Sequence, residues 1–494
     1  MSTELSNEEN SRLEKLNKIK EFGIHPYPEK FDKKLMIKQC FDSEEGVKVM
    51  TAGRVIMFRD MGKLTFGHVQ DESGRMQFAL KQDDLGKDNY KQFIKLIDLG
   101  DFIGLEGEIF VTHKGEKSIL VNKWTFLGKS LKPLPEKFHG LKDTEIKYRQ
   151  RYLDLISNNE TMERFKLRSS IIRKIREFYW KKNFIEVETP TLLHSASGAH
   201  AKPYITHNNG LDIDVHLRIS HELPLKELIV GGFDKIFELG KAFRNEGIDP
   251  SHLPEHTHLE HYCAYWSYED NMKFTEEMVD FIFDELKLDR KIKVVGKDGE
   301  AKEVDFTTPW PRINYVDQIN KDCGVDVSKY DDAKKLAKDL KEKGIEVEDM
   351  DNAGIATLVD NLYKKVSRPK LVGPVFLFNY PIELQPLARR NDENNEIVDQ
   401  FQLVVNGWEL IKAYSELVDP IDQQKRFEEQ AKLKEGGDDE TMAVDYDYVD
   451  AMKYGMPPIS GWGMGIDRFL TIITEQENLR DVVFFPLMKP KDKE

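Results

Sequence analysis

The sequence predicts an α+β protein in which a small N-terminal β-barrel precedes a larger domain that mixes strands with long helices. Short alternating runs, separated by turns that contain Gly and Asp, fill residues 47–126. Beyond residue 141, runs with helical spacing alternate with strand-like runs. A chain of 494 residues has room for two to four domains.

Composition excludes several classes of protein. The formal net charge is −15, which argues against indiscriminate DNA coating. No run of eighteen apolar residues occurs, and the polar, acidic start at Met1 lacks the basic and apolar regions of an export signal. The three cysteines form no CxxC pair, so neither a disulfide framework nor a zinc knuckle is expected. We therefore expect a cytoplasmic protein that binds neither membranes nor DNA.

The first 140 residues predict one helix and then a five-stranded barrel. Leu13, Leu16 and Ile19 recur at helical spacing before Gly23, which is a typical helix stop. Five strand-like runs follow, with a short helix between the third and the fourth, and this is the order of elements in an OB-fold barrel. The strands are expected at 47–58, 64–70, 75–80, 102–112 and 117–126, and the helix at 90–97.

One face of this barrel carries candidate nucleic-acid contacts. Arg59, Phe66, His68 and Gln77 fall on the first three strands, on the face that such barrels use to stack and read bases. The alternative is that Phe66 belongs to the barrel core and that Gln77 is merely solvated. Both interpretations remain open from the residues alone.

A second domain is expected from residue 141 to residue 494. The run Lys132-Pro133-Leu134-Pro135 is typical of a linker, and residues 142–156 predict a charged helix after it. Residues 270–370 are rich in helical patterns and in charge but poor in candidate chemistry. We therefore expect a helical insertion there, within a catalytic or binding domain that covers the rest.

Two stretches of the second domain are expected to contribute strands to a sheet, and the second of them carries candidate polar residues. A helix at 165–179 leads into a strand ending at Pro190, which suits a sheet edge or an interface. A strand at 233–243 is followed by Arg244, whose planar guanidinium suits a carboxylate or a phosphate. A return strand is expected at 257–266. Side-chain alternation places four polar residues on one face of it: His256, His258, Glu260 and Tyr262.

The third element is the run Gly461-Trp462-Gly463-Met464-Gly465, which continues into a helix. Alternating glycines weaken a strand, so they indicate a ligand that approaches bare backbone. We expect Asp467 to cap the helix and Arg468 to point from its first turn. The spacing of the glycines fits neither the dinucleotide-binding fingerprint nor the P-loop.

These elements, in this order and behind an OB barrel, resemble the class II aminoacyl-tRNA synthetases, and most closely those of the bacterial lysyl-tRNA synthetase type. The resemblance implies a six- to seven-stranded antiparallel sheet flanked by helices, and a homodimer built on the helix and strand ending at Pro190. It extends over nearly the whole chain. The matching stretches are PEKFHGLKDTEIKYRQRYLDLIS, AKPYITH, VGGFDKIFELGKAFRNEG, LARRND and GMGIDRF.

The resemblance also implies a reaction. The carboxylate of L-lysine attacks the α-phosphate of ATP, pyrophosphate leaves, and the 3′ end of tRNA(Lys) then takes the lysyl group. No protein nucleophile is needed, so catalysis should consist of positioning and electrostatic stabilisation. Arg244 and Arg468 are the expected catalytic residues, because two guanidinium groups around a polyphosphate suit the charge that develops at phosphorus.

Individual residues gain expected roles by the same resemblance. Those expected to bind ATP are Arg244, Glu246, His252, His256, Glu409, Gly465 and Arg468. Those expected to bind lysine are Gly198, Glu222, Arg244, Glu260, Tyr262, Lys412, Tyr414 and Glu416. Those expected to read the anticodon are Arg59, Phe66, Gln77 and Glu116, with Phe66 stacked on the central uridine.

Mg²⁺ is the expected cofactor, and the expected ligand positions are Gln402, Glu409 and Glu416. Gln402 departs from the family pattern, which usually has Glu there, so metal binding should be weaker. Lys412 stands where Asn normally touches the carboxyl end of the substrate, and its ammonium could pair with that carboxylate or with Glu409. Tyr414 replaces Phe, and His256 replaces the aromatic ring that normally stacks on adenine.

Metal-site interpretations of the histidines are disfavoured. His252, His256, His258 and His261 are spaced like a zinc cluster, but strand alternation should turn His261 away and no cysteine supports the site. An HExxH motif at His221 fails because position 225 is Leu.

Three other functions remain as alternatives. An aspartyl or asparaginyl tRNA ligase would need a cationic pocket, which Glu260 and Glu416 disfavour and Lys412 favours. A non-catalytic single-stranded nucleic-acid-binding protein would have no reason to keep both Arg244 and Arg468. A protein-lysylating paralogue would usually lack the barrel.

Overall fold

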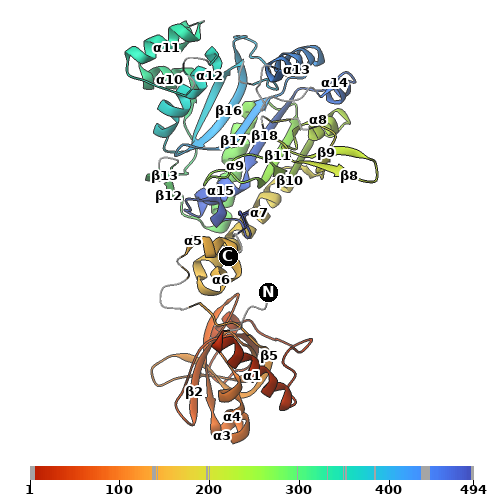
Figure 1. Cartoon of the computed structure of the whole chain (residues 1–494). Coiled ribbons are helices and arrows are strands. Elements are labelled where there is room, and N and C mark those ends of the chain that lie inside the picture. Colours follow the sequence, from red (N-terminus) through yellow and green to blue (C-terminus); the bar gives the residue numbers. More distant parts are fainter. Residues whose placement is uncertain are drawn as a thin grey trace. The chain divides into compact units, whose positions relative to one another are not determined.

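The computed structural model describes residues 6–490, apart from 136–140, 142, 196–197, 200, 297–298, 331, 349, 351–352, 383–384 and 436–444. The chain divides into two units, residues 1–162 and 163–494 (Figure 1). The boundary expected at residue 140 lies outside the described residues. Within the described part, no helix is both long and apolar enough to cross a membrane.

The first unit contains the expected OB-fold barrel. Helix α1 (Asn7–Glu21) begins at a capping box formed by Ser6 and Glu9. Five strands close the barrel in the order β1-β2-β3-β5-β4, with a helical segment between β3 and β4, so the OB-fold prediction is confirmed. The remaining bounds are α2 (Ile37–Asp42), β1 (Lys48–Asp60), β2 (Leu64–Asp71), β3 (Gly74–Lys81), α3 (Gln82–Leu85), α4 (Lys87–Leu96), β4 (Phe102–Val111) and β5 (Lys117–Gly128).

Alternation along β2 determines which residues fill the barrel. Thr65, Gly67 and Val69 are buried, whereas the residues between them keep part of their surface exposed. Phe78 of β3 and Phe93 of α4 meet edge to face at 6.0 Å in the core. Phe66 points the other way and does not belong to the barrel core formed by the described residues. The interpretation of Phe66 as a core residue is therefore wrong.

The charged helix expected at 142–156 is two helices. They are α5 (Thr144–Arg149) and α6 (Arg151–Ser157), and they are separated at Gln150, whose φ of −124° and ψ of 55° are not helical. The buried Arg151 donates to Asp154 at 2.7 Å within α6. The charge pattern indicated helix correctly, but it carried no signal for the break.

The second unit is built on a sheet of eight strands in the order β14-β15-β16-β17-β18-β11-β10-β6. The six strands from β15 to β10 are antiparallel, whereas β6 and β14 pair parallel to their neighbours at the two edges. These edge strands of two and three residues extend the expected six- to seven-stranded sheet. The bounds are β6 (Ile185–Glu186), β10 (Lys235–Phe243), β11 (Glu255–Ala264), β14 (Arg312–Asn314), β15 (Val375–Pro381), β16 (Ile397–Val405), β17 (Trp408–Ser415) and β18 (Ile459–Gly465).

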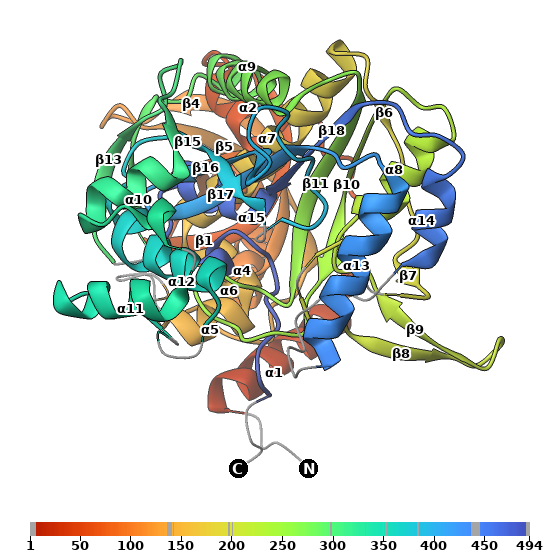
Figure 2. The same ribbon diagram turned by 90° about the horizontal axis from the view of Figure 1, so that it is seen from above.

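Helices cover this sheet on both sides. Helices α7 (Asn159–Lys181), α9 (Tyr268–Leu286) and α15 (Ile466–Ile473) contribute to the main apolar core on one face. Helices α8 (Glu222–Val230), α13 (Pro420–Glu435) and α14 (Tyr446–Met452) gather near β10 and β11 on the other (Figure 2). A separate three-stranded sheet contains β7 (Leu192–Leu193), β8 (Ile205–Asn208) and β9 (Ile213–Leu217).

The segment expected as a helical insertion mixes helices with a hairpin. The hairpin is β12 (Lys291–Val295) and β13 (Ala301–Asp305), and the helices are α10 (Tyr315–Cys323), α11 (Ala333–Glu342) and α12 (Ile355–Leu362). These three helices share a second apolar core with β15 and β16. Helix α9, at the start of the segment, instead packs in the main core.

The helix-facing side of β11 is anchored by a buried histidine. The Tyr179 hydroxyl lies 2.8 Å from His261 Nδ1, and His261 Nε2 lies 2.8 Å from Asn271 Oδ1. The imidazole also stacks on Trp462 at 5.0 Å. Burial lowers the pKa of His261 to about 3. The ring is therefore neutral in the folded protein, and His261 faces away from His256 and His258 as expected.

We expect this histidine to make the second unit sensitive to acid. Because the unfolded chain protonates His261 near pH 6.5 and the folded chain only near pH 3, stability is fully present above pH 6.5 and falls below it by about 1.4 kcal/mol per pH unit. His261→Phe should cost about 2 kcal/mol at pH 7.5 through two lost hydrogen bonds, but should remove this acid-dependent component. Urea unfolding at pH 7.5 and 5.5, followed by tryptophan fluorescence, measures both effects.

The exposed His207 provides the control. His207→Phe should leave the pH dependence as it is in the parent chain. A pH dependence that is identical in His261→Phe and the parent would contradict the assignment.

Candidate functional site

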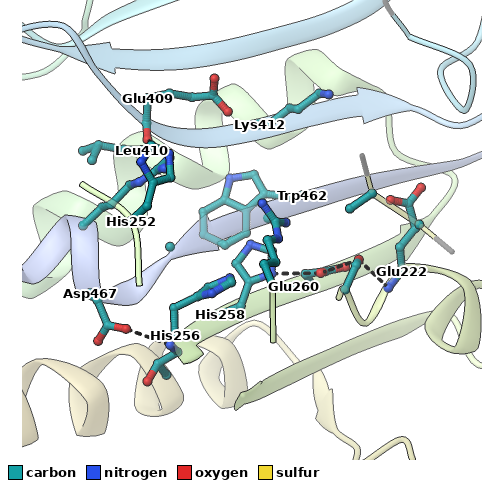
Figure 3. Close-up of a pocket in the computed structure, with 18 of the residues that line it drawn as sticks. Glu222, His252, His256, His258, Glu260, Glu409, Leu410, Lys412, Trp462 and Asp467 are labelled. Carbon is teal, nitrogen blue, oxygen red and sulfur yellow. Dashed lines mark hydrogen bonds and ion pairs between the residues drawn. The ribbon is translucent and has the colours of Figure 1, made fainter. Parts of the chain in front are cut away.

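A cavity of about 340 Å³ lies on the face of the sheet opposite α7 and α9. Strand β18 forms its floor, and side chains of β17 and β11 stand on either side of that strand (Figure 3). Residues of α8, of the loop that follows β10 and of the segments 198–199 and 385–387 also line it. In Figure 3, Glu409 and Lys412 extend from β17, whereas His256, His258 and Glu260 extend from β11.

The alternating glycines of β18 give the cavity its depth. Gly461, Gly463 and Gly465 line it, whereas Trp462 packs on the opposite side against His261. A Cβ at Gly461 would overlap Glu416 Oε1 and lie 2.5 Å from Tyr262 Cε1. At Gly465 it would meet only Arg468, at 3.7 Å. Side chains of the protein therefore press against the bare strand at its first glycine, while the last glycine has open space above it.

The sheet register orders the cavity into rows across the strands. Lys412 of β17 and Glu260 of β11 both pair with Gly463. One row further, Tyr414 and Tyr262 both pair with Gly461. Paired residues of neighbouring antiparallel strands point to the same face, so each glycine lies between two functional side chains.

The cavity is closed beyond Gly461 by a buried cluster of charges. Lys226 Nζ lies 2.6 Å from Glu222 Oε1 and 2.5 Å from Glu416 Oε2. The rings of Tyr262, Tyr414 and Tyr448 surround this ammonium at 5.7 to 5.8 Å.

This cluster sets two carboxyl groups against one ammonium. Burial raises the pKa of Glu416 to about 8, and Lys226 opposes that rise. Glu416 Oε1 has no hydrogen-bond donor in the described part of the chain, although it is buried. A buried oxygen without a donor is costly, so this position favours an incoming cation or N–H group.

Glu260 is held as a carboxylate in the middle of the cavity. It accepts from Ser220 Oγ at 2.9 Å and from the His221 backbone N–H at 3.0 Å, and His258 Nδ1 lies 2.9 Å away. Burial acts to raise its pKa, but the hydrogen bonds from His221 and His258 bring that pKa well below the usual value. Glu260 is therefore ionised and fixed in orientation.

The end beyond Gly465 carries the two arginines. Arg468 Nη1 donates to the Glu409 carbonyl at 3.2 Å, and Arg244 Nε donates to the Ile219 carbonyl at 3.4 Å. Burial lowers the pKa of His256 well below its usual value, so this ring is neutral next to both guanidinium groups. Positive groups, a neutral ring and bare backbone together suit a nucleotide.

The expectation that Asp467 caps the helix after β18 is wrong. The N-cap is Gly465, and α15 begins at Ile466. The Asp467 carboxylate instead accepts from the Thr257 backbone N–H at 2.8 Å and from Arg168 at 2.6 Å. It ties α15 to β11 and α7, because both donors belong to distant segments.

Most residues expected to bind ATP, lysine or Mg²⁺ come together in this one cavity, but Gln402 and Glu416 do not line it. Gln402 accepts from the Tyr380 hydroxyl at 2.7 Å, and Glu416 lies behind Gly461. Those that line the cavity are Gly198, Glu222, Arg244, Glu246, His252, His256, Glu260, Tyr262, Glu409, Lys412, Tyr414, Gly465 and Arg468.

Sequence reasoning missed Lys226, Ser220 and His221. Lys226 follows Glu222 by four residues on α8, which is the spacing of a helical ion pair and was a usable signal. Nothing local marked Ser220 or His221, because their partner Glu260 is about 40 residues away.

A different histidine grouping arises from the fold. Ligand atoms of His221, His258 and Glu260 lie within 4.8 Å of one another, a spacing that a metal ion would accept. Glu260 Oε1 already takes donors from Ser220 and His221, however. The hydrogen bonds that the Glu260 carboxylate accepts account for this grouping, and no metal is needed to explain it.

The barrel of the first unit gathers its expected residues on one outer surface. Phe66 pairs with Arg59 across β1 and β2, and His68 pairs with Gln77 across β2 and β3. Gln77 Nε2 donates to Ser118 Oγ at 3.2 Å, and His68 Nε2 lies 3.3 Å from Glu116. The interpretation of Gln77 as merely solvated is wrong, because the side chain is buried and hydrogen-bonded.

Comparisons with known proteins agree with both units. Residues 143–489 match the family of tRNA synthetases class II (D, K and N), and residues 49–127 match the OB-fold nucleic acid binding domain. The chain is 44% identical to the lysine–tRNA ligases of Fervidobacterium nodosum and Thermotoga maritima over 97% of its length, covering 94% and 95% of those proteins. It is also 44% identical to that of Moorella thermoacetica, with 98% of each chain covered. The chain therefore belongs to the class II tRNA synthetases, and within them to the lysine–tRNA ligase family.

Proposed function

We propose that this chain is a lysine–tRNA ligase, which uses ATP to activate L-lysine as lysyl-adenylate and then transfers the lysyl group to the 3′ end of tRNA(Lys). The observation that carries the choice of amino acid is the buried cluster at the closed end of the cavity. Glu222 and Glu416 set two carboxyl groups against the single ammonium of Lys226. Burial raises the pKa of Glu416 to about 8, and an added ε-ammonium would favour its ionised form, whereas the carboxylate of aspartate would add a further buried negative charge.

The side chain of lysine fits this end in other respects. Tyr262 and Tyr414 stand on either side of Gly461 and offer ring faces to an aliphatic chain that ends in a cation. The free Glu416 Oε1 lies against Gly461 and offers an acceptor. The ionised Glu260, one row further along β18, suits the α-ammonium.

This placement orders the reacting groups along β18. A lysine with its ε-ammonium beyond Gly461 has its carboxylate directed toward the arginine end, where ATP would bind. Its carboxylate oxygen attacks the α-phosphorus, the bond to the pyrophosphate oxygen breaks, and the ribose hydroxyl of tRNA later displaces AMP from the lysyl carbonyl. Arg244 and Arg468 are suited to stabilise the charge at phosphorus, so the protein contributes positioning and electrostatics.

We also propose Mg²⁺ as the cofactor, carried with ATP and held by Glu409. The Glu409 side chain lines the cavity at the arginine end and has no ion-pair partner among the described residues. Mg²⁺ usually takes one or two protein carboxylates together with substrate phosphates, so one carboxylate suffices. The ion would neutralise phosphate charge. Gln402 and Glu416 lie outside the cavity lining and contribute nothing comparable in this arrangement.

The barrel surface supports recognition of the anticodon. Phe66 of β2 is partly exposed, Arg59 and Gln77 lie on the neighbouring strands β1 and β3, and Glu116 directly precedes β5. A partly exposed ring flanked by hydrogen-bonding groups suits an unpaired base, which stacks on the ring while its edge is read.

We propose a homodimer and a cytoplasmic location as well. Around the end of α7 and the short strands after it, large apolar side chains are exposed that a partner subunit would cover. They are Trp180, Ile185, Leu192, Ile205 and Leu211. The three cysteines are free and buried, which suits a reducing compartment.

ATP–pyrophosphate exchange with each of the twenty amino acids tests the function directly. Exchange should depend on lysine, and exchange supported by aspartate or asparagine instead would refute the proposal. Glu416→Gln should lower kcat/KM for lysine about 30-fold or more and leave the KM for ATP nearly unchanged, because it removes one partner of a buried charge pair. Glu255→Gln is the control, since Glu255 is exposed on the same sheet and outside the cavity.

Two glycine substitutions test the order of substrates along β18. Gly461→Ala should weaken lysine binding at least tenfold, because its methyl group would displace Tyr262 and Glu416, while ATP binding stays near the parent value. Gly465→Ala has room within the protein and should weaken ATP binding instead. Calorimetric titration with each substrate separates the two, and equal losses of both ligands in either variant would contradict this order.

Substitution of the partly exposed Phe66 ring tests the anticodon surface. Phe66→Ala should leave lysine-dependent exchange unchanged and raise the KM for tRNA(Lys) by about tenfold, since stacking on one base is worth about 1–3 kcal/mol. Phe102→Ala, at an exposed ring on β4, is the matched control. If Phe66→Ala reduced exchange and charging equally, the residue would be structural.

A further inference from the structure

Lys412 is a cation in the cavity that forms no salt bridge with a described residue, although the Glu409 carboxylate is near it. Its side chain lines the cavity from β17, yet it has no hydrogen-bond or ion-pair partner among the described residues. Lys226 offers the contrast, because its ammonium is held between two carboxylates. An unpaired ammonium inside a cavity is costly unless a ligand supplies the negative charge.

A β-bulge places this ammonium close to the metal-binding candidate. Glu409 and Lys412 are three residues apart, so in a regular strand they would point to opposite faces. The register between β16 and β17 shifts at Leu403 and Val404, and both side chains consequently line the cavity. The bulge thus adds a positive charge next to the Glu409 carboxylate.

The register also fixes how far Lys412 lies along the cavity. It pairs with Gly463, midway between the tyrosine pair at Gly461 and the arginine end at Gly465. On the other side it pairs with Gln402, a neutral residue that is held by Tyr380 and lies outside the lining. The middle of the cavity is where the amino-acid and nucleotide ends meet.

The charges near this point favour direct binding of phosphate. Arg244, Arg468 and Lys412 provide three positive charges, and Glu409 is the carboxylate that β17 adds to the cavity. Glu260 faces Lys412 across Gly463, but its carboxylate already accepts from Ser220 and His221. A pair of carboxylates at this place would repel a phosphate unless divalent ions intervened. An ammonium instead binds a phosphate oxygen as a compact point charge with three donors.

We propose that Lys412 contacts the α-phosphate of the bound nucleotide. Its ammonium supplies there the positive charge that a divalent ion would supply in a site with a pair of carboxylates. The inference rests on the proposed function, because it takes the cavity to hold ATP. As the carboxylate oxygen–phosphorus bond forms and the bond to pyrophosphate breaks, negative charge grows on the α-phosphate oxygens. Lys412 stabilises that charge and keeps its proton throughout.

Calorimetric titration of ATP in EDTA and in excess Mg²⁺ tests this assignment without relying on turnover. In EDTA, Lys412→Met should weaken ATP binding by about tenfold or more, because a charge-assisted hydrogen bond is lost. The loss should shrink in excess Mg²⁺, when the ion supplies part of the charge. Lys412→Arg should restore most of the affinity, and Lys321→Met, at an exposed lysine of α10, should behave like the parent chain.

Two outcomes would overturn the assignment. One is equal ATP affinity of the parent and Lys412→Met in EDTA. The other is a loss of lysine affinity, measured without ATP, while ATP affinity is unchanged, since Lys412 would then serve the amino-acid carboxylate. Failure of the proposed function itself is distinguishable, because the parent chain would show no lysine-dependent pyrophosphate exchange at all.

Discussion

The site depends on a central strand that is bare on one face and heavily anchored on the other. Gly461, Gly463 and Gly465 present only backbone to the cavity, which weakens β18 as a strand. Trp462 compensates from the opposite side, where it stacks on His261 and donates to Thr275 of α9 at 2.9 Å. Anchoring from one side and open space on the other let the middle of a sheet serve as the floor of a cavity.

Everything else in the cavity is placed relative to that strand. The neighbouring strands supply side chains in register. Two tyrosines therefore flank Gly461, Lys412 and Glu260 flank Gly463, and the arginine end lies beyond Gly465, so successive groups are two residues apart along β18. Buried charge is unevenly matched along this line. Two carboxyl groups surround one ammonium at the closed end, and cations exceed carboxylates at the other, which favours a zwitterionic amino acid next to a polyphosphate.

Local patterns predicted the elements well, but they did not reveal contacts between distant segments. The barrel order and the two faces of β11 follow from alternation and turn residues, which are local properties. Asp467 was assigned to its own helix because its actual donors, Thr257 and Arg168, are 210 and 299 residues away. The break at Gln150 left no local signal.

The grouping of site residues came mostly from the resemblance to a family, because spacing alone cannot bring Glu222, Glu260 and Glu409 to one cavity. What no sequence pattern indicated was the bulge that turns Glu409 and Lys412 to the same side. Lys412 forms no ion pair with a described residue, which makes its position in the cavity energetically costly and leaves its ammonium available to a ligand. This becomes visible only when the surrounding contacts are known.

The ion pair of Lys226 with Glu222 and Glu416 has an implication for redesign. The ammonium at the closed end, behind the cavity lining, belongs to a side chain of α8 and not to the sheet itself, so its reach can be changed without substituting a strand residue. Shorter residues at 226 offer a route to a roomier recess for elongated, non-natural amino acids. The adjacent carboxylates would then select for positively charged candidates among them.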